Sequence, residues 1–409
     1  MFEHFLKPIK KFRKSYLPGI VTASADEDPS SIATFSIVGA ATGFVLLWVV
    51  ILAAPLLIAV HRLSARLGDV TKKGLITLIK ESFGKKTALF CLIVFIIANL
   101  LSLVADIIGM AAGFQLLTGE SYLYFIIPLI ILVWSIIVFD TYQHIARYFF
   151  WFSGILLVYV VSGLLASPDW IQVFKSIAPP KIEFNLAYLA AFLAILGATF
   201  SPYSFFWQTK QEIEERRDVK NIKQSEKSVI YGFIYSSFIA FFVILASASA
   251  VLNHNINTLT IADIAQALTP LAGGWAVKFF GLGLIGSGIL AIPVLVTASA
   301  YAMAEYFDWP DGLRREPRRA KGFYSVITFG FLICLAALLF NFQPIKAIFY
   351  SQLFVGVLAP IMIYFILKLA SSKKVMGSFR CHWLSLLLGW LTIILLLAGD
   401  ALFIYFLIL

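Results

Sequence analysis

The chain has 409 residues, of which 60% are hydrophobic and only 13% are charged, and its mean hydropathy is +0.90. Soluble domains carry about 25% charged residues, so this composition excludes a soluble globular protein and indicates a protein that crosses the membrane several times. The formal net charge is +10, and the basic loops of a membrane protein account for it without a nucleic-acid partner. Three cysteines, Cys91, Cys334 and Cys381, show no metal-binding spacing, so we expect free thiols.

Apolar segments of about 20 residues, the length that a bilayer-spanning helix needs, recur along the whole chain. Residues 1–15, which precede them, are basic and lack the apolar core and cleavage site of a signal peptide, so we expect a cytoplasmic arm. We expect eleven membrane-spanning helices, at about residues 16–40, 43–64, 87–115, 121–139, 146–167, 186–209, 228–252, 272–306, 322–341, 345–369 and 383–408.

The distribution of basic residues tests this count, because one added or missing span would exchange the two sides of everything after it. With the N-terminus inside, 28 of the 32 Lys and Arg residues fall on the inner side. The exceptions are Lys175, Lys181, Lys278 and Lys346. We therefore expect a cytoplasmic N-terminus and, after an odd number of spans, a C-terminus outside.

Two spans are interrupted by polar residues. The first contains three consecutive carboxylates and a proline, at residues 26–29, and the sixth contains a proline among polar residues, at 197–204. A proline within a span frees backbone groups that lipid cannot satisfy, and acids at membrane depth indicate a functional site. A bound cation would satisfy both requirements, whereas the alternative interpretation is a proline kink with a helix cap.

The spacing of the two breaks predicts the architecture. Five spans separate them, and an odd repeat length inverts the second copy. We therefore expect two inverted five-helix repeats, at about residues 16–167 and 186–369, with the substrate bound between half-helices near the bilayer midplane. Residues 371–409 would add an eleventh helix outside the transporter core of residues 16–370.

Short motifs around both breaks resemble a known family. They are Leu-Pro-Gly at 17–19, Asp-Pro at 28–29, Leu-Ser-Ala-Arg-Leu-Gly at 63–68, Gly-Ala-Thr at 197–199, and Ser-Gln at 351–352. With these motifs the chain resembles the NRAMP divalent-metal transporters from about residue 15 to 370. The resemblance implies the all-α LeuT-type fold with broken helices 1 and 6, inward transport of divalent cations by alternating access, and no enzyme activity.

The chain also departs from that family at the breaks. Members that carry manganese and iron have Asp-Pro-Gly-Asn in the first helix and Ala-x-x-Met-Pro-His in the sixth, but here the asparagine, methionine and histidine are replaced by Ser31, Ser201 and Tyr203. A thioether favours transition metals, whereas oxygen ligands suit hard ions such as Mg2+. Residues 201–208 and 285–295 are similar to bacterial NRAMP-related magnesium transporters, which implies Mg2+ uptake, with Mn2+ tolerated and weak or no proton coupling.

Asp28 is the principal candidate ligand, because an unpaired charge beside the break would be prohibitive. Successive helical residues point about 100° apart, so at most two of the three acids can face one cavity, and Glu27 is the second candidate. The resemblance adds candidate oxygen ligands at Ser31, Ala198, Ser201, Tyr203 and Gln352.

Proton coupling depends on other positions. Proton-coupled members have an acid pair in the third helix, which here reads Leu103 and Asp106, and a second histidine in the sixth, which here is Gln208. The five histidines of the chain are expected near span ends or in loops, so none is predicted at membrane depth. Asp106 is interpreted either as a titrating acid or as a hydrogen-bonded partner of a neighbouring helix.

Three alternatives remain for comparison. A proton-coupled Mn2+ or Fe2+ importer would share the fold. A carrier of organic solutes is disfavoured because three clustered acids repel anions, and an enzyme acting on magnesium diphosphate would need a second acidic motif. We expect a protein of the bacterial inner membrane, with a divalent cation as substrate, no cofactor and no obligatory protein partner.

Overall fold

The computed structural model describes residues 19–139, 152–177, 182–215, 219–254, 275–313, 315–338 and 344–408. The predicted arm at residues 1–15 and the start of the fifth predicted span lie outside these residues. Every regular element within them is helical. The all-α fold that the resemblance implied is therefore confirmed for the described residues.

The first span is divided into a helix at residues 19–26 and α2 (Pro29–Thr42). The elements that follow are α3 (Leu47–Thr71), α4 (Leu75–Phe83), α5 (Lys85–Thr118), α6 (Leu123–Phe139), α8 (Leu157–Leu165), α9 (Trp170–Ile177), α10 (Leu186–Thr199), α11 (Pro202–Glu214), the short 3-10 helix η1 (Val219–Asn221), α12 (Ile222–His254), α15 (Trp275–Phe307), the 3-10 helix η2 (Pro317–Arg319), α16 (Lys321–Leu338), α17 (Pro344–Ser371), α18 (Lys373–Met376) and α19 (Trp383–Ile408).

Each of the eleven predicted spans has a helical counterpart in the described residues. By length and hydropathy, seven helical segments could cross a membrane unaided, and Leu123–Phe139 and Lys321–Ala337 are shorter apolar helices. The remaining counterparts are the broken first span and the pair Phe152–Leu165 and Trp170–Ile177, which is bent by 109°. The second helix of that pair, α9, lies between the fifth and sixth predicted spans, in a segment for which the sequence predicted no helix.

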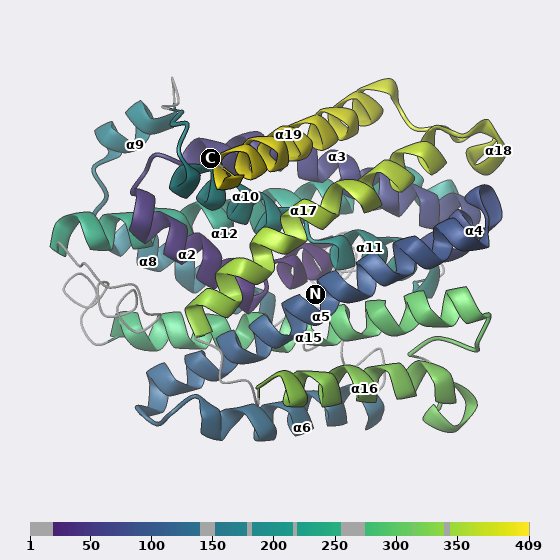
Figure 1. Cartoon of the computed structure of the whole chain (residues 1–409), viewed down its shortest axis with the longest axis horizontal. Helices are drawn as coiled ribbons and strands as arrows, with labels where there is room; N and C mark the ends of the chain where they lie inside the picture. Colours follow the sequence, from purple (N-terminus) through teal and green to yellow (C-terminus); the bar gives the residue numbers. More distant parts are fainter. Residues whose placement is uncertain are drawn as a thin grey trace, which may run out of the picture.

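The helices pack as one bundle (Figure 1). Long helices α5 and α15 lie against each other, α12 packs on α2 and α3, and α10 packs on α17. Helices α6 and α16 lie together at one edge of the view, and α19 lies at the opposite edge. The two broken spans, which are purple and teal in Figure 1, are thereby surrounded by other helices.

Glycines bring the broken spans very close to their neighbours. A Cβ added at Gly197 of α10 would lie 1.8 Å from the carbonyl oxygen of Gln352 in α17. In the first span, a Cβ at Gly19 would lie 2.1 Å from the carbonyl oxygen of Ser228, and one at Gly39 would lie 2.6 Å from that of Ile244. Both Ser228 and Ile244 belong to α12, so the two halves of the first span rest on the same helix through their glycines.

Candidate functional site

The break in the first span is built by Asp28 and Pro29. Asp28 has extended backbone angles and is the N-cap of α2, where its side chain accepts the N–H of Ser31 at 2.6 Å. Pro29 is the first residue of the helix. A backbone N–H at this position would have no partner within the helix, so the absence of the N–H in proline removes no hydrogen bond. The predicted break is present, and it includes the helix cap of the alternative interpretation.

The break in the sixth span lies between α10 and α11. Phe200 ends α10 with φ −107° and ψ 56°, and Ser201 precedes Pro202 in an extended conformation. The Ser201 hydroxyl is buried and finds no hydrogen-bond partner among the described residues. Pro202 is the first residue of the second half-helix, as Pro29 is of α2. Both breaks therefore consist of an extended residue followed by a proline that begins a helix.

The two breaks meet around the Asp28 carboxylate. Tyr203 OH of α11 lies 2.9 Å from Asp28 Oδ2 and 2.8 Å from the carbonyl oxygen of Ala25. Ser31 Oγ donates to the carbonyl oxygen of Ala198 at 3.0 Å. These contacts join residues of the two broken spans that lie roughly 170 positions apart in sequence.

Ser30 links this group to two further helices. Its N–H donates to Asp106 Oδ1 of α5 at 3.0 Å, and its hydroxyl donates to Asp28 Oδ1 at 2.8 Å. Gln352 Nε2 of α17 donates to the same hydroxyl at 2.5 Å. We define the Asp28 cluster as Asp28, Ser30, Ser31, Asp106, Ala198, Tyr203 and Gln352.

All the atoms of the Asp28 cluster that could bind a metal ion are oxygens. Asp106 Oδ2 and Gln352 Oε1 are buried and have no hydrogen-bond partner among the described residues. No group of three His, Cys, Asp or Glu side chains within those residues could hold a metal ion. The available donors are therefore two carboxylates together with hydroxyl, amide and carbonyl oxygens, which is a donor set for hard cations.

The three consecutive acids point to different neighbours. Glu27 Oε1 accepts a hydrogen bond from Ser236 of α12 at 2.6 Å, and Asp26 lies beside Ser204 of α11. Of these three acids, only Asp28 makes hydrogen bonds to other members of the Asp28 cluster. The structure thus brings together most of the candidate ligands, but it directs Glu27 to α12.

A buried histidine contradicts one sequence-based expectation. His61 is fully buried, and α3 continues beyond it to Thr71 instead of ending near residue 64. Its ring stacks on Phe233 with centroids 3.7 Å apart, and its Nε2 lies 3.3 Å from Ser204 Oγ. The prediction that all histidines lie near span ends or in loops is therefore wrong for His61, which lies in the interior of α3. The error arose from placing the end of the helix too early.

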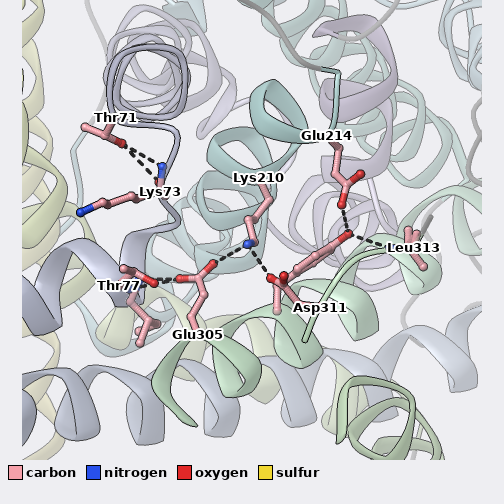
Figure 2. Close-up of polar contacts among 10 residues, drawn as sticks. Thr71, Lys73, Thr77, Lys210, Glu214, Glu305, Asp311 and Leu313 are labelled. Carbon is pink, nitrogen blue, oxygen red and sulfur yellow. Dashed lines mark hydrogen bonds and ion pairs between the residues drawn. The ribbon is translucent and has the colours of Figure 1, made fainter. Parts of the chain in front are cut away.

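A second polar network, which the sequence did not indicate, lies near the end of α11 (Figure 2). Lys210 Nζ lies 3.0 Å from Glu305 Oε1 of α15 and 2.7 Å from Asp311 Oδ2. Glu305 Oε2 accepts the N–H groups of Ile76 and Thr77, in the first turn of α4, at 3.0 and 3.2 Å. One carboxylate thus joins three helices.

The same network has a second branch. Tyr301 OH of α15 donates to Glu214 Oε1 at 2.7 Å and accepts the N–H of Leu313 at 3.1 Å (Figure 2). Lys210 Nζ also lies 4.7 Å from the centroid of the Tyr301 ring. The end of α11 is therefore fixed to α15 by both charge and aromatic contact.

Comparison with known proteins identifies relatives along almost the whole chain. The model of the Nramp family, "Natural resistance-associated macrophage protein-like", matches residues 19–406. The divalent metal cation transporter MntH of Aeromonas hydrophila is 27% identical over 96% of both chains. MntH of Levilactobacillus brevis is 26% identical over 93% of this chain and 86% of its own.

Solved structures agree on the fold. The Eremococcus coleocola manganese transporter superposes with a TM-score of 0.74 at 19% identity, covering 96% of this chain and 86% of its own. Mhp1, a nucleobase-cation-symport-1 family transporter, has a TM-score of 0.60 at 15% identity and covers 96% and 91%. These similarities confirm the LeuT-type fold that the resemblance implied.

Proposed function

The chain belongs to the Nramp family, and on that premise we propose that it moves divalent metal cations into the cell through the Asp28 cluster. The observation that carries this proposal is the position of the Asp28 carboxylate, which lies where the two broken spans meet and is fully buried. A buried carboxylate without a cationic partner is costly. A divalent cation would supply that partner.

The chemistry of the donors favours Mg2+ as the substrate. The cluster has no sulfur ligand. Ser201 stands where family members that carry manganese and iron are expected to have a methionine. Mg2+ binds through one or two carboxylates and keeps several of its waters. Asp28 and Asp106 with the small side chains of Ser30 and Ser31 suit such an ion, and Mn2+ would be tolerated.

A second candidate is a proton-coupled importer of Mn2+. The relatives named above are divalent-metal or manganese transporters, and Mn2+ also accepts oxygen ligands. Asp106 favours this candidate, because its Oδ2 atom is buried without a hydrogen-bond partner among the described residues and a buried carboxyl group can hold a proton. The two candidates differ in whether protons accompany the metal.

Proton coupling is not required for accumulation. A membrane potential of 100 mV is worth about 2.3 kcal/mol per charge, so a divalent cation that enters a negative interior gains about 4.6 kcal/mol. That energy corresponds to accumulation on the order of a thousandfold. We propose a cycle in which the ion enters from outside, the half-helices tilt, and the ion is released inside.

Flux into liposomes tests the proposal. Under an inside-negative potential, we expect Mg2+ influx without acidification of the lumen, and loss of nearly all flux in Asp28→Ala. The matched control is Asp400→Ala, which removes another buried acid from α19, outside the Asp28 cluster. Normal Mg2+ flux in Asp28→Ala would refute the site, whereas Mn2+ influx with acidification and no Mg2+ flux would establish the second candidate.

A further inference from the structure

A groove separate from the Asp28 cluster lies between α5, α15 and α16. Its volume is about 450 Å3, within the range of about 300–1,000 Å3 that is usual for small-molecule sites. Leu100, Leu103, Leu295, Val296 and Phe329 form much of its apolar wall. Its polar residues include Asn99 and Ser299, which are hydrogen-bonded to each other at 2.8 Å. The groove therefore suits hydrocarbon and not a hydrated cation.

The groove opens on the surface that faces the bilayer. Phe329 and Ile333 line it and are 62% and 47% exposed, and Ile97 on the adjacent face of α5 is 49% exposed. In a membrane protein such apolar surface contacts lipid. Whatever fills the groove must therefore enter from the bilayer.

One glycine keeps the groove open. A Cβ added at Gly330 of α16 would meet only Leu103 Cδ2, at 3.7 Å, which is an ordinary contact distance. Gly330 is therefore not needed for close packing of helices, in contrast to Gly197. A larger side chain at this position would occupy the groove without displacing the backbone.

Basic side chains lie near the end of the groove at Trp309, where the neighbouring acid Asp308 is paired with Lys80. Trp309 lines the groove and packs over Gly322, at the start of α16. Arg318 and Lys321 are exposed on the adjacent turns. Arg319 lies 3.8 Å from Glu316 in an exposed pair, which contributes little. A tryptophan beside basic side chains is typical of the interface between the hydrocarbon and anionic headgroups.

We propose that this groove binds an anionic phospholipid, with one acyl chain between α5, α15 and α16 and the headgroup at Arg318 and Lys321. The apolar walls, the opening to the bilayer and the basic end each match one part of such a lipid. This inference requires only that the chain lies in a membrane. It does not depend on which metal ion is carried.

Native mass spectrometry of the full-length protein tests the acyl-chain part. Phosphatidylglycerol and phosphatidylcholine are added separately to delipidated protein, and bound lipid is quantified. Gly330→Leu is expected to lower phosphatidylglycerol binding by roughly tenfold or more, since its side chain takes the place of several lipid methylenes. The matched control is Gly154→Leu, because this helical glycine lies outside the groove and a Cβ there meets no atom within 4 Å.

The headgroup part has its own variant, which leaves the helix packing untouched. Arg318→Gln with Lys321→Gln is expected to weaken phosphatidylglycerol binding by about 30-fold, at roughly fivefold per charge, without changing phosphatidylcholine binding. Equal binding of both lipids to the unmodified protein would overturn the headgroup assignment. Unchanged phosphatidylglycerol binding in Gly330→Leu would overturn the groove assignment. The assignment would also be overturned if the unmodified protein formed a dimer and Gly330→Leu abolished it, since a second copy of the chain would then occupy the groove.

Discussion

Ser30 shows how much one hydroxyl can organise in this site. Its backbone and side chain together contact Asp28, Asp106 and Gln352, which lie on α2, α5 and α17 or at their ends. Hydrogen bonds to charged groups contribute about 1.5–3 kcal/mol. We infer that Ser30 orients the carboxylate of Asp28 before the ion arrives.

Ser30→Ala tests this role. The change keeps the N–H that bonds Asp106 but removes the hydroxyl that bonds Asp28 and Gln352. We expect the metal concentration at half-maximal flux to rise about tenfold, because roughly 1.4 kcal/mol of orientation is lost. Uptake measured over a range of Mg2+ and Mn2+ concentrations provides the value.

The control for this change is Ser36→Ala. Ser36 lies on the same helix, is equally buried, and its hydroxyl has no hydrogen-bond partner among the described residues. We expect its half-maximal concentration to equal that of the unmodified protein. Equal effects of the two substitutions would mean that Ser30 acts through helix packing and not through Asp28.

The sequence predicted the positions of the two breaks better than the directions of the side chains around them. Asp28 could be placed at a break because charge and proline at membrane depth leave few alternatives. The direction of Glu27 could not be found, since residues within a break do not follow helical spacing. His61 was misplaced because an apolar segment does not reveal how far a helix continues into the polar loop beyond it.

The network around Lys210 determines how the second half-helix is held. Lys210 and Glu305 have side-chain exposures of only 10% and 5%, so their charges depend on each other. Removing one partner of a buried ion pair leaves the other charge uncompensated, which commonly costs about 3–5 kcal/mol. Helix α11 is therefore anchored at this end while its other end lies at the break.

Lys210→Met is expected to lower the midpoint of thermal unfolding of the purified protein by several degrees, since it leaves two carboxylates unpaired at a cost of roughly 3–5 kcal/mol. Adding Glu305→Gln should recover part of the loss. Intrinsic fluorescence during heating measures both variants. A loss in the double variant equal to the sum of the separate losses would contradict the coupling.

An exposed ion pair supplies the comparison. Lys73 lies 2.7 Å from Glu81, but both side chains are about half exposed. Lys73→Met should therefore change the stability by less than about 1 kcal/mol. A shift as large as that of Lys210→Met would show that charge loss in general, and not burial, is responsible.

At the scale of helices, long apolar segments were predicted well and irregular ones were not. Helices α5, α12, α15 and α17 were located to within several residues by their hydropathy. The short helix α9 was missed because eight residues carry too little periodicity to distinguish a helix from a loop. Its bend of 109° depends on tertiary packing, which no local pattern encodes.

The basic residues predict the orientation of the whole molecule in the membrane. The three segments that join α3 to α5, α11 to α12, and α17 to α19 carry many of them, and such segments remain in the cytoplasm. Helix α19 begins after the last of these segments, at Trp383, and runs away from that face. The C-terminus is therefore expected outside.

Reporter fusions test this orientation. Alkaline phosphatase fused after Leu409 should be active, because it folds only outside the cytoplasm, and the same enzyme inserted between Lys373 and Phe379 should be inactive. A fluorescent protein at each position should give the reverse pattern. An inactive C-terminal phosphatase together with a fluorescent C-terminal fusion would require an even number of spans.

The contacts of Gly19 and Gly39 with α12 have a consequence for the proposed transport cycle. Glycine has no side chain that must change its rotamer when one helix rolls on another, although the N–H of Gly19 also donates to Ser228 Oγ at 2.9 Å. We therefore infer that the first span can pivot at its break while α12 supports both halves. The transport rate is then expected to depend partly on a helix surface that the ion never touches.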